Sequence, residues 1–215
     1  LDSISSLNLS QNEIKKLSSP VIDFYEKTAD YKLKLNVKWN PFLKPFGYIV
    51  NRLFSQRINQ LNIPTQNIQE SENLTSEIIE LVSNENNEIR YTIWLRKFQS
   101  IGKVIYSGIY TTCKLASGIT CIKAVFPLPK GNATVILKPS IGEKNELILD
   151  SSGRKFGDAG FYFLLNDSKG NYWSQYIKAF TDKLVVSEER NNLKANQTLK
   201  LWNIKVANFE YVIEK

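Results

Sequence analysis

The most regular pattern of apolar and polar positions lies in residues 31–39, Tyr-Lys-Leu-Lys-Leu-Asn-Val-Lys-Trp. Apolar side chains occupy every second position, and lysine or asparagine occupies the positions between them. Because successive side chains of a strand point to opposite faces, this alternation predicts a β-strand with one buried face. The lysine-rich face has two interpretations, an edge strand protected against aggregation or a surface for a binding partner.

Helical patterns precede and follow this strand. Ser10-Gln11-Asn12-Glu13 is a capping box that predicts a short helix, and Ser19-Pro20 predicts a second helix, with Ser19 as its N-cap, that ends near Asp30. Residues 48–61 place apolar side chains at helical spacings. We expect this helix to pack on a sheet, with docking on a membrane surface as the alternative. Residues 64–76 are typical of a polar connector.

Short strands separated by turn residues fill the rest of the chain. The predicted strands cover 77–83, 89–98, 103–113, 119–126, 132–138, 145–150, 160–166, 171–179, 182–187 and 197–213, the last being one bent strand or two. Hairpin-length turns between them indicate an antiparallel meander, and no βαβ alternation is present.

These patterns predict an α+β fold in which N-terminal helices pack on a large curved antiparallel β-sheet or partly closed β-barrel, as in lipocalins. We divide the chain into a helical segment with one basic strand, residues 1–76, and an antiparallel β body, residues 77–215. The segment packs on the body, so a single compact domain is expected.

Composition narrows the possible functions. The 215 residues include no histidine, which excludes histidine-based triads, Cys–His pairs and histidine zinc sites, and we expect no cofactor. The net charge of +7 suits an anionic partner or a well-solvated basic surface. No apolar run approaches the ~18 residues of a membrane span. Because position 1 is not methionine, we expect the chain to begin inside a longer translated product.

The two cysteines flank a predicted three-residue turn, Ala116-Ser117-Gly118. This turn would place Cys113 directly opposite Cys121, close enough for a disulfide. Two reduced thiols packed in the sheet are the alternative. A disulfide would imply an exported protein, and its absence would leave a cytoplasmic or membrane-peripheral location.

Residues 151–163, Ser-Ser-Gly-Arg-Lys-Phe-Gly-Asp-Ala-Gly-Phe-Tyr-Phe, combine glycines, cations, a carboxylate and aromatic rings around a turn. Backbone N–H groups in such a turn can form an anion nest beside Arg154 and Lys155. In the alternative interpretation, Asp158 caps these N–H groups itself. The residues predicted to bind a ligand are Arg154, Lys155, Gly157, Asp158 and Tyr162.

Three stretches also resemble a known family: Phe24-Tyr25-Glu26-Lys27-Thr28; Pro45-Phe46-Gly47 with Arg52-Leu53-Phe54-Ser55; and residues 126–134 followed by 153–162. They are similar to an uncharacterised family of bacterial conserved hypothetical proteins. The resemblance covers most of the chain from about residue 20. It implies a bacterial source, and it carries no activity or site residue.

The leading hypothesis is a non-catalytic protein that binds an apolar or amphiphilic molecule, such as a lipid, in a barrel cavity, with Arg154 and Lys155 at an anionic head group. One alternative is an enzyme that uses carboxylate and tyrosine groups near Asp158, chosen from Asp150, Glu146, Tyr162 and Tyr176. Another is an interaction module that docks on a protein or membrane surface through residues 31–39 and 48–61. Sequence-specific binding of nucleic acid is not expected, because residues 89–98 are partly apolar on both faces.

Overall fold

The computed structural model describes residues 3–7, 9–43, 68–128 and 130–215. The predicted helix 48–61 lies outside these residues, as do two of the stretches that resemble the known family, Pro45-Phe46-Gly47 and Arg52-Leu53-Phe54-Ser55. The helical elements are η1 Ile4–Leu7, α1 Gln11–Ile14, α2 Ser19–Glu26 and η2 Thr28–Asp30. The strands are β1 Lys32–Trp39, β2 Ile68–Val82, β3 Ile89–Phe98, β4 Val104–Lys114, β5 Thr120–Leu128, β6 Gly131–Ile141, β7 Leu147–Asp150, β8 Gly160–Asn166, β9 Tyr172–Tyr176, β10 Phe180–Glu189, β11 Asn192–Leu201 and β12 Ile204–Glu214.

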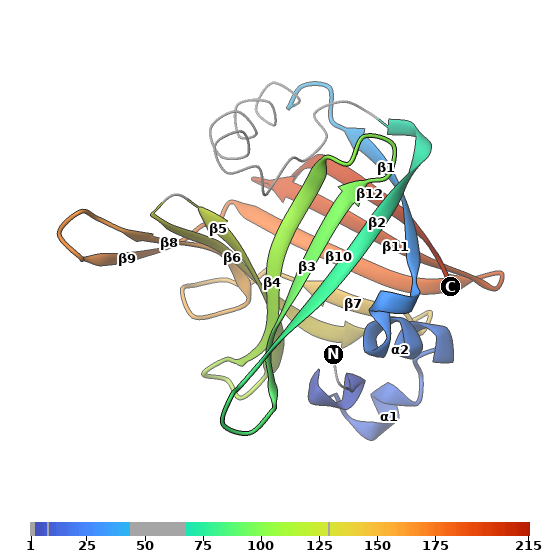
Figure 1. The fold of residues 1–215 in the computed structure, drawn as a ribbon, viewed down its shortest axis with the longest axis horizontal. Helices are drawn as coiled ribbons and strands as arrows, with labels where there is room; N and C mark the ends of the chain where they lie inside the picture. The colour runs from blue at the N-terminus through green and yellow to red at the C-terminus, as the bar shows by residue number, and fades with distance from the viewer. Residues whose placement is uncertain (1–2, 8, 44–67, 129) are drawn as a thin grey trace.

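Ten of the described strands form a closed ring in the order β5-β4-β3-β2-β1-β12-β11-β10-β7-β6, and β6 pairs back with β5. Every strand pairing in this ring is antiparallel. The hairpin β8–β9 lies outside the ring and pairs with the first half of β6 (Figure 1). The prediction of a helix-capped antiparallel barrel is therefore confirmed.

The alternating pattern of residues 31–39 is confirmed as β1. Leu33, Leu35 and Val37 are buried in the barrel interior, whereas the lysines between them face outward. The interpretation of β1 as an edge strand is wrong, because β1 pairs with β2 on one side and β12 on the other. Two outward lysines instead form ion pairs with β12, Lys34 with Glu214 and Lys38 with Glu210.

The polar connector predicted for residues 64–76 is also partly wrong. Residues 68–76 belong to β2, which pairs with β1 and β3, so the division at residue 76 falls inside a strand. Few apolar side chains mark this part of β2. Its backbone hydrogen bonds to both neighbours stabilise it without a local hydrophobic pattern.

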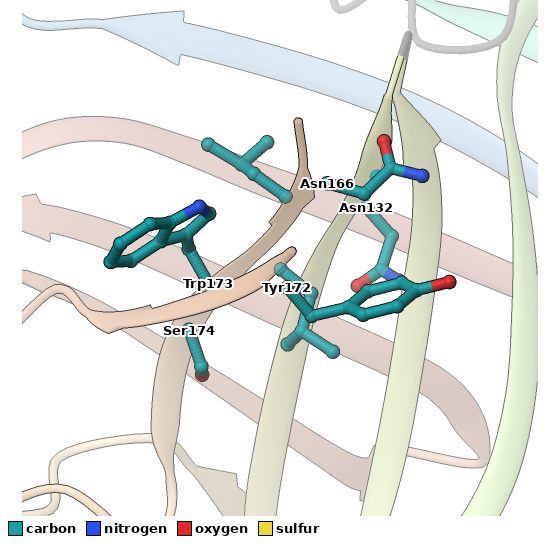
Figure 2. Close-up of a pocket in the computed structure, with 8 residues that line it drawn as sticks. Asn132, Asn166, Tyr172, Trp173 and Ser174 are labelled. Carbon is teal, nitrogen blue, oxygen red and sulfur yellow. The ribbon is translucent and has the colours of Figure 1, made fainter. Parts of the chain in front are cut away.

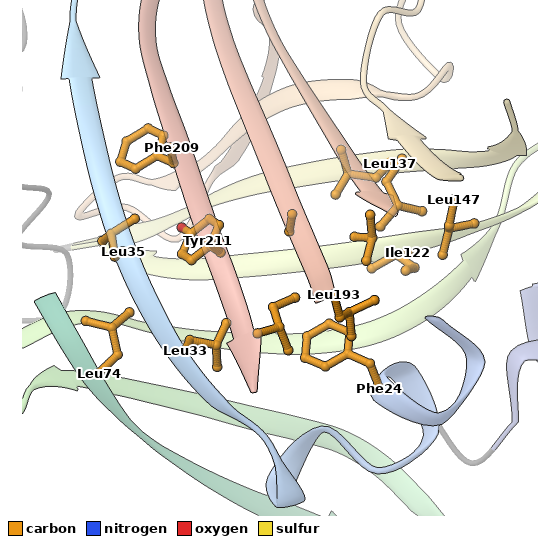
Figure 3. Close-up of a cluster of buried hydrophobic side chains, with 14 of the residues drawn as sticks. Phe24, Leu33, Leu35, Leu74, Ile122, Leu137, Leu147, Leu193, Phe209 and Tyr211 are labelled. Atoms are coloured by element: carbon orange, nitrogen blue, oxygen red, sulfur yellow. The ribbon is translucent and has the colours of Figure 1, made fainter. Parts of the chain in front are cut away.

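The interior of the barrel is filled by side chains from many strands (Figure 3). Leu35 and Tyr211 meet there on adjacent strands, and Phe24 of α2 reaches the same cluster from the end that the helices cover. Fully burying a large apolar side chain such as leucine or phenylalanine contributes about 1.5–3 kcal/mol to the stability of the fold. The continuous cluster therefore ties the helices to the barrel.

Local signals fix the starts of the helices, with two differences from the prediction. The second helix ends at Glu26 rather than near Asp30, because the helix breaks at Lys27 and the chain continues as the separate 3-10 helix η2. The capping box at Ser10 and Glu13 is present and starts α1. Helix α2 begins at Ser19, but its N-cap is Ser18 rather than Ser19, and Pro20 occupies the first turn. Proline is tolerated there because the first N–H groups of a helix have no partner within the helix.

Antiparallel pairing gives the barrel two distinct ends. Strand β1 runs away from the helices, so the turns β3–β4, β5–β6, β8–β9 and β11–β12 lie at the end opposite them. We call this end the rim. The turns β2–β3, β4–β5, β6–β7 and β10–β11 lie at the end near the helices (Figure 1).

Candidate functional site

The loop predicted to bind a ligand, residues 151–159, connects β7 to β8. Strand β7 ends where Asp150 pairs with Lys138, and β8 begins where Gly160 pairs with Ile136. Both partners lie in the middle of β6. The loop therefore leaves the wall of the barrel midway between its ends, as the connection from β7 to β8 shows in Figure 1.

The backbone of the loop is capped by the carboxylate of Asp158, a residue of the same loop. One oxygen of Asp158, Oδ2, accepts hydrogen bonds from the backbone N–H groups of Arg154 at 3.0 Å and Lys155 at 3.2 Å. These bonds hold the pKa of Asp158 below its ordinary value. The Tyr162 hydroxyl accepts from the N–H of Gly157 and donates to the Asp158 carbonyl. The capping interpretation thus describes the backbone, while a ligand contact by the Arg154 and Lys155 side chains stays a prediction.

The other carboxylates named for an enzyme have local hydrogen bonds as well. Asp150 accepts from the N–H of Ser152, and Glu146 accepts from the N–H of Lys144. Tyr176 donates its hydroxyl proton to the Gly153 carbonyl at 2.7 Å, which closes the base of the loop. Within the described residues, no three cysteine, aspartate or glutamate side chains gather to hold a metal ion.

Cys113 and Cys121 lie directly opposite each other on β4 and β5, as the turn at 116–118 predicts. Gly118 has a φ of 85°, the left-handed conformation that this turn needs. Both thiols are free in the structure. Burial raises the pKa of Cys121 to about 11, so this thiol is a poor nucleophile at neutral pH.

A second candidate region is the β8–β9 hairpin, which we call the arm. It projects from the barrel at the far left of Figure 1. Trp173 is 64% exposed and Tyr172 83% exposed, and Leu164 and Leu165 are also exposed. Aromatic side chains in solvent on a projecting hairpin are typical of a contact surface, since a core does not need them there.

The arm carries a pocket of about 200 Å³. Its lining combines apolar side chains with neutral polar ones: Gly131, Asn132, Leu164, Leu165, Asn166, Tyr172, Trp173 and Ser174. Figure 2 shows the Trp173 and Tyr172 rings pointing in different directions, with Asn132 and Asn166 near Tyr172. Gly131 is required beside it, because a Cβ there would overlap the carbonyl oxygen of Leu164.

One face of the arm continues into the barrel core. Leu165 pairs with Trp173, and by alternation both share a face with Phe163 and Phe161 of β8. The ring centroid of Phe161 lies 5.2 Å from that of Phe163 and 4.9 Å from that of Phe180 on β10. Both Phe161 and Phe180 pack against the interior cluster. We call this run of side chains, from Trp173 to Phe180, the apolar track.

A buried carboxyl group lies two residues beyond the track. Asp182 of β10 is 7% exposed, and its Oδ2 accepts a hydrogen bond from the Gln197 side chain at 2.8 Å. Its Oδ1 has no hydrogen-bond partner in the described part of the chain. Burial raises the pKa of Asp182 to about 7, so this group titrates near neutral pH.

Arg96 of β3 is the buried cation of the barrel interior. Its guanidinium carbon lies 3.9 Å from the ring centroid of Trp94 and 5.6 Å from that of Tyr211. Stacking on aromatic faces suits the planar guanidinium and offsets part of the cost of removing it from water. By alternation Arg96 shares a face with Trp94 and Phe98, and the burial of Phe98 and Arg96 shows that this face is turned to the interior.

The sequence predicted a strand at 160–166 and a turn after it but not the arm. The sequence feature that could have indicated the arm is Tyr172-Trp173, two large aromatic residues next to a turn. Aromatic pairs usually indicate a buried face, so the pattern alone does not show that β9 lacks a second neighbour. Asp182 was missed for the opposite reason, because a charged residue in a strand is usually solvated.

Comparison with known proteins identifies one relative. Over 215 residues the chain is 27% identical to "Uncharacterized membrane protein YndJ" of Bacillus subtilis (strain 168). The match covers 99% of this chain and 37% of the relative, so the chain spans little more than a third of that protein. No family model matches the chain. No solved structure matches it. The predicted similarity to uncharacterised bacterial proteins is confirmed. Among the described residues, no helix is both long and apolar enough to cross a bilayer.

Proposed function

We propose that this protein binds an apolar or amphiphilic molecule, such as a lipid with an anionic head group, without transforming it. The binding site that we propose is the arm. The observation that carries the proposal is the apolar track, which places large apolar side chains on one face of the arm from exposed Trp173 to the barrel core.

An apolar chain gains most from such a track. Contact with Trp173 and Leu165 would remove apolar surface of both partners from water, at roughly 25 cal/mol per Å². Phe161, Phe163 and Leu165 follow one another along β8, so the track suits an elongated molecule. Its inner end, at Phe161 and Phe180, is partly buried against the interior cluster.

By alternation, Asn132, Asn166 and Ser174 lie on the face of the arm opposite Leu165 and Trp173, so these polar side chains do not continue the apolar track. The polar end of the ligand is instead assigned to the tip of the arm. Two exposed lysines adjoin it in sequence, Lys130 before Gly131 and Lys169 in the β8–β9 turn. These cations would attract an anionic head group to the arm, a role that the sequence assigned to Arg154 and Lys155.

The relative supports the same proposal, because its name describes a membrane protein. A barrel carried by such a protein would meet amphiphilic molecules at high local concentration. The enzyme alternative gains no specific observation, since Asp158 forms the cap of a surface turn.

Titration with a dansyl-labelled fatty acid and with lysophosphatidylglycerol tests the proposal. We expect saturable binding to the wild type and affinity that falls about tenfold or more in a Leu165→Ser/Trp173→Ser variant, because each change removes apolar contact area. The matched control is Ile79→Ser/Tyr91→Ser, two exposed apolar residues on β2 and β3. Equal affinity of the arm and control variants, or no binding by the wild type, would contradict the proposal.

A further inference from the structure

The described turns at the rim are more basic than those at the opposite end of the barrel. At the rim and next to it, six lysines are exposed: Lys103, Lys130, Lys169, Lys178, Lys200 and Lys205. No ion pair joins any of them to another residue that the structure describes. The one carboxylate in the described turns of the rim, Asp167, accepts bonds from the backbone of Lys169 and Asn171.

The opposite end is rich in glutamate. Its turns and the adjoining strand ends carry six glutamates against four cations: Glu85, Glu88, Glu143, Glu146, Glu188 and Glu189 against Arg90, Lys114, Lys144 and Arg190. A net charge of +7 is therefore not spread evenly over the surface, and the rim would face an anionic partner in preference to the helix-covered end.

The β11–β12 turn at the rim presents apolar side chains to water. Trp202 is 72% exposed, and Ile204 beyond it is also exposed. Trp202 has a φ of 47° and Asn203 a φ of 66°, so both central residues of this turn are left-handed. Asn and Gly adopt this conformation readily, whereas a large side chain is unfavourable there. Because Trp202 is neither packed nor conformationally favoured, fold stability does not explain it.

The Trp202 turn is fixed beside a lysine. The Trp202 N–H donates to the carbonyl of Ala179 at 2.7 Å, and Lys178 precedes Ala179 in the chain. Lys200 and Lys205 flank the same turn on β11 and β12. The structure thus places an exposed tryptophan and isoleucine within a group of three lysines.

We propose that the rim docks on an anionic phospholipid bilayer through Trp202, Ile204 and the flanking Lys178, Lys200 and Lys205. Tryptophan and lysine are the side chains that favour the headgroup region, where the ring contacts acyl chains and the ammonium group meets phosphate. The rim cations in the described residues are all lysines. Nucleic-acid and bidentate phosphate recognition favours arginine, whereas the lysines of the described rim suit a diffuse anionic surface.

Vesicle co-sedimentation tests the docking surface. The probes are vesicles of phosphatidylcholine alone and of equal parts phosphatidylcholine and phosphatidylglycerol. We expect binding to the anionic vesicles only, weakened by added salt. The Lys178→Gln/Lys200→Gln/Lys205→Gln variant is expected to bind about tenfold or more weakly, since each lysine near such a surface contributes about a fivefold change.

The matched control removes the same charge elsewhere. Lys15→Gln/Lys16→Gln/Lys114→Gln changes three exposed lysines at the helix-covered end, and its vesicle binding is expected to equal that of the wild type. Equal weakening of both triple variants would show that net charge alone drives binding, which overturns the proposal. Binding of RNA with the same dependence on the rim lysines, and none of vesicles, would overturn it as well.

The apolar part has a separate test. Trp202→Asn/Ile204→Thr is expected to keep the fold, because Asn suits the left-handed position, and to lose vesicle binding by about tenfold. Quenching of tryptophan emission by brominated acyl chains should disappear in this variant. Unchanged quenching would contradict insertion of Trp202. These residues differ from Leu165 and Trp173, so this proposal and the proposed ligand site can fail independently.

Discussion

At the scale of single residues, Asp182 combines features that rarely occur together. Its carboxyl group is buried, one oxygen accepts from Gln197, and the other has no partner among the described residues. An ionised carboxylate in such a place is costly, so burial favours the protonated form. The backbone N–H of Asp182 has a hydrogen-bond partner, because it donates to the Ser151 hydroxyl at 2.7 Å.

The raised pKa predicts a stability that depends on pH. The pKa of Asp182 rises from 3.8 to about 7 in the folded protein, so folding binds a proton between these values. This group's contribution to the free energy of unfolding is complete below about pH 4 and is lost as the pH rises to about 7. Asp182→Asn should remove this loss and stabilise the protein above neutral pH, by up to about 4 kcal/mol.

Urea denaturation of wild type and Asp182→Asn at about pH 5 and about pH 8 measures the effect. Asp158→Asn is the control with the opposite sign. The pKa of Asp158 is lowered by its backbone hydrogen bonds, so its contribution is lost only as the pH falls toward that lower value. If the free energy of unfolding depends on pH in the same way in the wild type and in Asp182→Asn, the buried carboxyl does not titrate as proposed.

At the scale of elements, the arm differs from every strand of the ring. Strand β9 pairs with β8 alone in the described structure, and the tip side chains are exposed. The turn itself is well made, because Asp167 accepts from Lys169, Asn171 and the Asn171 side chain. The arm is therefore ordered by local bonds and by β6 rather than by burial.

This arrangement predicts that the arm tip is dispensable for folding. Replacing residues 165–173 by a two-residue Asn-Gly turn should change the melting temperature little, because few buried contacts are lost. The same change should abolish binding of the dansyl-labelled fatty acid. By contrast, Phe24→Ala in α2 should cost about 3–5 kcal/mol and leave that binding unchanged, because Phe24 belongs to the core.

Thermal unfolding followed by circular dichroism, together with fatty-acid titration, checks both variants. A large loss of melting temperature in the arm variant would show that β8 and β9 support the ring. The sequence identified β8 at 160–166 and the turn after it, because glycine, asparagine and aspartate are local signals. It could not show that β9 has one neighbour among the described strands, because pairing is decided by strands far away in the chain.

At the scale of the whole molecule, the ring closes through strands that are distant in sequence. Strand β1 pairs with β12 over its whole length, from Lys32 with Glu214 to Trp39 with Ala207. The C-terminal Lys215 forms an ion pair with Asp23 of α2 at 2.7 Å. The last strand therefore connects the helical segment to the body.

This closure predicts that β12 is essential. Ending the chain after Asn203 removes the strand between β1 and β11 and exposes two strand edges, so we expect loss of cooperative unfolding and aggregation. Ending it after Glu214 removes Lys215 and its exposed ion pair, so we expect little change in stability. Size-exclusion chromatography and urea denaturation distinguish the two. A monomeric, cooperative protein without β12 would contradict this role.

Several features follow from the sequence by itself. The alternation of residues 31–39, the capping box at Ser10 and the turn at Gly118 each depend on a few neighbouring residues. These local rules also give the bounds of β3 and β8 and the opposition of Cys113 and Cys121. An antiparallel barrel with N-terminal helices then follows from the strand lengths and short turns.

Only the tertiary structure decided which positions those elements occupy. It placed β1 inside the ring rather than at an edge, and it turned part of a polar connector into β2. It also left Trp173 exposed, buried Asp182 and gathered the lysines at the rim. The physical reason is the same in each case, because burial and charge segregation depend on pairings between strands that are remote in the chain.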